Sequence, residues 1–126
     1  MAWKTLEYTL TDSNLFEHDA LKELNSIEAL IDWSRVEHKL SGIYSKPKGE
    51  RAWPPLMMFK SLLLQHWYVL SDPALEKQLA RDLLFRRFVG LPLSEGVPDH
   101  STLWRFKQQL RKQNLIDVLF DEINQQ

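Results

Sequence analysis

One apolar segment, Pro54 to Leu70, constrains the fold of this chain more than any other feature. Its 17 residues place apolar side chains on most sides of a helix, which is typical of a helix buried within a protein. Pro54 and Pro55 suit the first turn of such a helix, because the backbone N–H groups are free there in any case. The segment is too short for a membrane span, and Lys60 and His66 make it too polar. We therefore predict a central buried helix that ends near Leu70.

The rest of the chain also shows helical patterns, and strand patterns are scarce. Only residues 3–11, WKTLEYTLT, alternate as a strand does, and this run is short. The length of 126 residues fits one domain. We predict an all-α fold, a small multi-helix domain over residues 1–126. Residues 1–50 form its helical N-terminal part, and residues 51–126 hold the central apolar helix and a helix-turn-helix-like C-terminal half.

Capping signals predict where the N-terminal helices begin. Asn25 or Ser26 would start the first helix. Ser34 and Glu37 match the capping box, in which the hydroxyl and the carboxylate each bind a free backbone N–H group. A loop is expected over residues 45–55, which contain Pro47, Gly49 and the two neighbouring prolines. The helix that begins at this capping box would end near Tyr44, before the loop. Its three inward apolar side chains would be Val36, Leu40 and Ile43.

Similar signals divide the second half of the chain into helices. Asp72 is the expected N-cap of a helix that has Pro73 at its first position. The stripe of leucines changes direction near Asp82, which predicts a bend or a second short helix there. The further signals are a helix end at Gly90, a cap at Asp99 or Ser101, and a break near Asn114.

Positive charge gathers in this second half, although the net charge of the chain is −1. Residues 77–112 hold eight basic and three acidic residues, whereas residues 1–50 hold six basic and nine acidic ones. Such segregation favours a local positive field on a protein that is neutral on average.

The helix that begins after Pro98 carries much of this charge. At 100° per residue, Leu103, Phe106 and Leu110 fall on one side and define a buried face. Arg, Gln and Ser side chains on an exposed face are those that reach base edges and phosphates in a major groove, although solvated helices show a similar pattern. The opposite, polar side carries these residues, with Trp104 on its flank: Ser101, Arg105, Gln108 and Lys112.

Several motifs follow one another along the chain in a fixed order. Arg51 lies in a loop with Pro54 and Pro55, and Leu-Ser-Asp ends the apolar helix at residues 70–72. RRFVGL follows at residues 86–91, and VPDHSTLWRF at residues 97–106. With the upstream segment IDWSRVEHKLSGIYSKPKG, this order closely resembles the N-terminal region of bacterial insertion-sequence transposases of the InsH-like, or IS-five, group. The resemblance covers about residues 31–126.

The resemblance implies DNA transposition by cut-and-paste strand transfer. In that family an RNase-H-like catalytic domain, whose Asp-Asp-Glu triad binds magnesium, would follow this region. Because the chain stops at Gln126, we expect a truncated transposase or a separately encoded N-terminal piece with no enzyme activity, catalytic residue or cofactor. Magnesium is expected only for the missing catalytic domain.

The residues themselves predict no metal site in this chain. The four histidines are far apart in the sequence, and the chain has no cysteine. Helix caps and solvated helix faces account for the four carboxylates that come nearest to a catalytic set: Asp99, Asp117, Asp121 and Glu122.

The expected partner is double-stranded DNA, at the terminal inverted repeats of an insertion element. Arg86 and Arg87 could contact phosphates, but salt bridges from them to an acidic N-terminal helix are an equally good interpretation. The residues predicted to contact bases or backbone are Ser101, Thr102, Arg105 and Gln108, and those predicted to contact phosphates are Lys107, Lys112, Arg86 and Arg87.

Two other interpretations of the chain stay open. It could be an interaction module that forms homodimers, or mixed dimers with full-length transposase, which its tryptophans and weak overall charge favour. It could also be a transposase remnant without a selected function. Under each interpretation we expect a bacterial cytoplasmic, nucleoid-associated protein without a membrane partner, because the N-terminus lacks the apolar run of a signal peptide.

Overall fold

The structure, a computed structural model, describes residues 19–42 and 53–125, and within these ranges it is helical without a strand. The all-α prediction is confirmed. Several segments considered above lie outside the described residues: the alternating run at residues 3–11, Ile43, Tyr44 and most of the predicted loop. The elements are a short 3₁₀ helix, η2 (Asp19–Lys22), followed by α1 (Asn25–Leu30), α2 (Trp33–Leu40), α3 (Pro55–Trp67), α4 (Asp72–Arg81), α5 (Leu83–Val89), α6 (His100–Lys112) and α7 (Ile116–Asn124).

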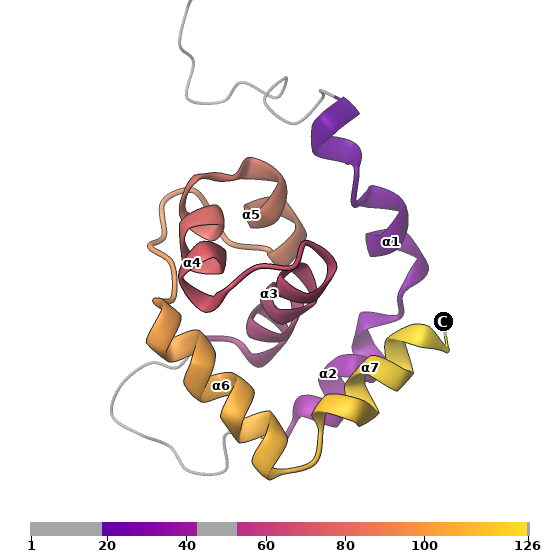
Figure 1. Cartoon of the computed structure of the whole chain (residues 1–126). Coiled ribbons are helices and arrows are strands. Elements are labelled where there is room, and N and C mark those ends of the chain that lie inside the picture. Colours follow the sequence, from indigo (N-terminus) through magenta and orange to yellow (C-terminus); the bar gives the residue numbers. More distant parts are fainter. Residues whose placement is uncertain (1–18, 43–52, 126) are drawn as a thin grey trace, which may run out of the picture.

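Helix α3 lies at the centre of the fold, as predicted. Every residue from Met57 to Leu64 is buried, and α2, α4, α5 and α6 all pack against this helix (Figure 1). The helix ends at Trp67 rather than near Leu70. The reason is that Val69 takes a left-handed backbone conformation, with φ 53°, which a helix cannot continue. None of the helices in the described ranges has the length and apolar character needed to cross a membrane.

Lys60, on the apolar helix α3, is buried, and its ammonium group has several partners. Its ammonium donates to Glu28 Oε1 at 2.9 Å and to the Phe88 carbonyl at 3.2 Å. It also lies 4.3 Å from the centre of the Trp33 ring, within the range of a cation–π interaction. This one side chain therefore links α1, α2 and α5 to the central helix.

Three of the predicted N-caps, those of α1, α2 and α4, are wrong by one or two residues. Helix α2 begins at Trp33, and its cap is Asp32, whose carboxylate accepts the Ser34 N–H at 3.1 Å. Ser34 already lies inside the helix, so the predicted capping box does not form. Val36 and Leu40 are buried as predicted, but the helix ends at Leu40.

The second error concerns α4. Its cap is Ser71, whose hydroxyl accepts the Ala74 N–H at 3.2 Å, and this places Asp72 and Pro73 at the first two helical positions. The first helix, α1, begins after Leu24 without a side-chain cap, although Asn25 is its first residue.

The other predicted helix boundaries are confirmed. Asp82 ends α4, and its carboxylate caps α5 through the N–H groups of Leu84 and Phe85. Gly90 ends α5 with φ 82°, and Asn114, with φ 56°, separates α6 from α7. Residues 90–99 connect α5 to α6, a longer connection than the three- or four-residue turn of a compact helix-turn-helix.

Candidate nucleic-acid interface

Helix α6 lies at the outside of the bundle with one face buried and one face outward (Figure 1). Leu103, Phe106 and Leu110 are buried, as the periodicity predicts. The opposite side, called here the polar face of α6, consists of Ser101, Arg105 and Lys112, which are exposed, and of Gln108, which is half-buried.

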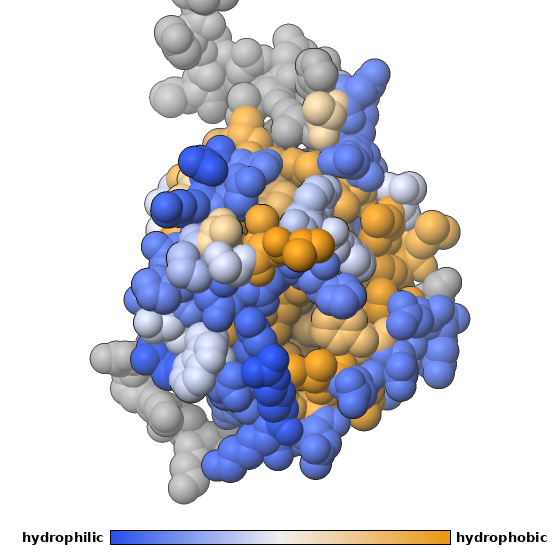
Figure 2. Space-filling view, in the orientation of Figure 1, coloured by the Kyte–Doolittle hydropathy of each residue, from blue (hydrophilic) through white to orange (hydrophobic). Residues whose placement is uncertain are grey.

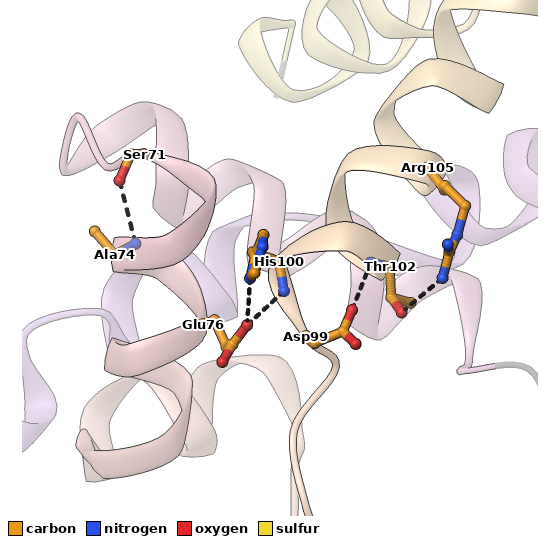
Figure 3. A network of polar contacts seen from close by, with 7 residues as sticks. All are labelled: Ser71, Ala74, Glu76, Asp99, His100, Thr102 and Arg105. Carbon is orange, nitrogen blue, oxygen red and sulfur yellow. Dashed lines mark hydrogen bonds and ion pairs between the residues drawn. The ribbon is translucent and has the colours of Figure 1, made fainter.

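The first turn of α6 is fixed by two carboxylates. Asp99 caps the helix, and its Oδ1 accepts the Thr102 N–H at 2.7 Å. This hydrogen bond lowers the pKa of Asp99 below its ordinary value. From α4, Glu76 Oε1 accepts the His100 backbone N–H at 2.6 Å and lies 3.0 Å from the ring Nδ1 (Figure 3). The backbone hydrogen bond from His100 likewise lowers the pKa of Glu76.

A second link between α4 and α6 lies further along the helix. Lys107 Nζ donates to Asp72 Oδ1 at 2.8 Å, and Gln65 Nε2 donates to the same oxygen at 2.7 Å. Lys107 is therefore half-buried and paired with a carboxylate. The prediction of a phosphate contact at Lys107 does not fit this placement, since its charge already serves the packing of α6 against α4.

The Asp72 carboxylate makes the stability of this link depend on pH. Burial raises the pKa of Asp72, but the hydrogen bonds from Lys107 and Gln65 outweigh burial and hold the pKa below its ordinary value. A carboxylate whose pKa is lower in the folded state stabilises the fold fully above about pH 4, and this contribution is lost as the pH falls through the folded-state pKa.

We expect Asp72→Asn to melt at a lower temperature than the wild type at neutral pH and to lose less stability on acidification. Thermal unfolding from neutral pH down to about pH 2 measures this, because that range covers the titration of an aspartate. The difference between the two melting temperatures should shrink in acid. A difference that stays constant would show that the Asp72 charge does not stabilise the fold.

Arg105 and Thr102 lie together on the first two turns of α6. Arg105 Nη2 donates to Thr102 Oγ1 at 3.3 Å, which directs the guanidinium along the outside of the helix (Figure 3). Thr102 itself is half-buried, and Ser101 is exposed beside it. Six of the eight predicted contact residues therefore lie on α6: Ser101, Thr102, Arg105, Lys107, Gln108 and Lys112.

Arg86, in contrast, serves the fold. Its side chain is buried, and Nη1 donates to the carbonyl oxygens of Pro92 at 2.9 Å and Glu95 at 3.1 Å. Nη2 donates to the Ala80 carbonyl at 3.3 Å. Neither the predicted phosphate contact nor the alternative salt bridge to the N-terminal helix fits these bonds, which hold the connection that leads to α6.

Arg87 is exposed but lies on another side of the molecule. It lines a small cavity with Leu24, Asn25 and Glu28, at the N-terminal side of the fold. The structure therefore does not bring Arg86 or Arg87 together with the polar face of α6.

The four carboxylates considered from the sequence do not form a metal site. Asp99 caps α6, and Asp117 and Asp121 are exposed as predicted. Glu122 is a correction: it is 5% exposed, and its Oε1 lies 2.7 Å from Arg35 Nε. Among the described residues, no group of three or more His, Asp or Glu side chains could hold a metal ion, so these residues do not fit a magnesium centre.

Comparison with protein families identifies the chain. The family model described as Transposase domain (DUF772) matches residues 12–109. The chain belongs to this transposase-domain family. The transposase domain therefore includes all helices from α1 to α5 and α6 as far as Gln109. No solved structure matches the chain.

Proposed function

We propose that this transposase domain binds duplex DNA through the polar face of α6. The observation that carries the proposal is the outward position of Arg105 on a helix whose opposite face is buried. A guanidinium in this position can donate two hydrogen bonds to the O6 and N7 atoms of a guanine. Lys112, exposed in the last turn, is suited to a phosphate contact.

The finer parts of the proposal concern the target and the reaction. The order of the motifs favours the InsH-like, or IS-five, group, so we assign the terminal inverted repeats of an insertion element as the DNA. In helix-turn-helix proteins the recognition helix enters the major groove while the preceding helix crosses the backbone. We assign the recognition role to α6 and the role of the helix that crosses the backbone to α4, which packs against α6 although α5 lies between them in the sequence. The proposal assigns DNA binding to this chain, not strand transfer, and places it at the nucleoid of the bacterial cytoplasm.

The proposal is tested with a DNA duplex that the protein selects from a library of random sequences, called here the enriched duplex. The labelled enriched duplex is titrated with the protein at several salt concentrations. Arg105→Ala should weaken specific binding by about 1–3 kcal/mol, and Lys112→Ala should reduce the salt slope by about 1. Lys39→Ala removes the same charge from an exposed position on α2 and should leave both quantities unchanged. Equal affinity for the enriched duplex and a scrambled one would contradict the proposed recognition of sequence.

A second candidate function is dimerisation, or mixed dimerisation with full-length transposase. It is favoured by several large apolar side chains that are exposed in the described part of the chain. On the face that Figure 2 shows, hydrophobic residues lie between hydrophilic ones. Sedimentation without DNA separates the two candidates. A tight dimer without DNA affinity supports dimerisation and contradicts the first proposal. The exposed apolar side chains that favour dimerisation are Leu30, Tyr68, Val69, Leu93, Trp104 and Val118.

A further inference from the structure

A surface pocket of about 370 Å³ lies where the start of α4 meets the first turns of α6. Trp104 supplies its largest apolar side chain and is 52% exposed. Pro73, exposed at the start of α4, supplies a second apolar surface, and Arg105 also lines the pocket. The pocket therefore places apolar and hydrogen-bonding groups side by side, directly beside the polar face of α6.

The backbone that carries Trp104 is held by the two links between α4 and α6. His100, four residues before Trp104, is bound to Glu76 of α4, and Lys107, three residues after it, is bound to Asp72. Trp104 thus lies between two anchored points on the flank of α6 that faces α4. A helix held in this way needs little rearrangement when a partner binds, which lowers the cost of the contact.

The charges around the pocket favour a nucleic acid as its occupant. Arg105 lines the pocket, and Lys112 is exposed further along the same helix. The two neighbouring carboxylates are paired, Asp72 with Lys107 and Glu76 with His100. The pocket therefore combines two apolar side chains with the cationic Arg105. In the major groove of DNA, the apolar group that such a surface can contact is the 5-methyl group of thymine.

We propose that Trp104, together with Pro73, contacts the methyl group of a thymine beside the base bound by Arg105. The inference rests on the proposed function and adds a specificity determinant to it. It assigns to this chain a DNA site in which a thymine and the base read by Arg105 are neighbours.

Replacement of thymine by deoxyuridine tests the contact directly, because it removes only the methyl group. Each thymine of the enriched duplex is replaced in turn, and binding by the wild-type protein is measured. We expect one replacement to weaken binding about 4-fold, the effect of withdrawing one methyl-sized apolar group from a buried contact. The same replacement should not change DNA binding by Trp104→Ala, because this variant lacks the indole. Its affinity for the unmodified duplex should already be lower than that of the wild type. Val118→Ala, which shortens another exposed apolar side chain, should respond to deoxyuridine as the wild type does.

Several outcomes would overturn the inference. If no deoxyuridine weakens binding while Arg105→Ala still does, the thymine contact is wrong and the proposed function stands. The thymine contact is also wrong if the enriched duplex contains no thymine. It is wrong as well if deoxyuridine weakens binding by the wild type and by Trp104→Ala equally. A wild-type dimer that Trp104→Ala dissociates, with no deoxyuridine effect, assigns the pocket to a second copy of the chain. Absence of any DNA binding overturns both proposals.

Discussion

Replacing Arg86 by alanine is expected to lower the free energy of unfolding by roughly 3 kcal/mol, although the residue is one of a pair of adjacent arginines. The Arg86 guanidinium donates to three carbonyl oxygens, those of Ala80, Pro92 and Glu95. Truncation would leave these acceptors without their charged donor and would release the connection between α5 and α6. Because the connection positions the start of α6, the proposed DNA binding should weaken together with the stability.

Arg81→Ala is the matched control for this prediction. It removes the same side chain from the last residue of α4, which is exposed, so its free energy of unfolding should change by about 0.5 kcal/mol or less. Urea denaturation followed by circular dichroism measures both variants. Equal losses of stability for the two variants, or a larger loss for Arg81→Ala, would contradict the role assigned to Arg86.

The second large effect is expected for Phe59→Ala, which should cost about 3–5 kcal/mol of stability. Phe59 is fully buried in α3, and its ring meets the ring of Phe120 edge-on, with centroids 5.9 Å apart and planes at 75°. Its removal would open a cavity between the central helix and α7 and would also end an aromatic contact. The size of the effect depends on how far the surrounding helices can close the cavity.

Phe59→Leu keeps part of the side-chain volume, so we expect a smaller loss than for alanine. Leu93→Ala, in the connection between α5 and α6, shortens a side chain that is 55% exposed and should change stability by about 0.5 kcal/mol or less. Urea denaturation compares the three variants. A loss for Phe59→Ala as small as that for Leu93→Ala would contradict the central position of α3 in the core.

Much of the helical framework could be predicted because its signals are local. An apolar run of 17 residues that covers most sides of a helix has to be buried, and α3 is central. The buried face of α6 follows from the spacing of Leu103, Phe106 and Leu110, and the division at Asp82 from a stripe that changes direction. Each of these signals is contained within one continuous stretch of the sequence.

The roles of individual polar residues could not be predicted in the same way, because their partners lie elsewhere in the chain. Lys107 pairs with Asp72 across 35 positions, and Glu122 pairs with Arg35 on another helix. Arg86 turns back to a connection whose path depends on the whole bundle. The capping box predicted Ser34 as the cap of α2, whereas Asp32, two residues earlier, caps the helix.

The central claim is that DNA meets the outward side of α6. Titration of the isotope-labelled protein with the enriched duplex, followed by amide chemical shifts, tests this most directly. The account predicts that the largest chemical-shift changes are those of the Ser101, Arg105, Gln108 and Lys112 amides. The chemical shifts of the α2 and α7 amides should not change. Changes concentrated on α2 or α7, with α6 unaffected, would contradict it.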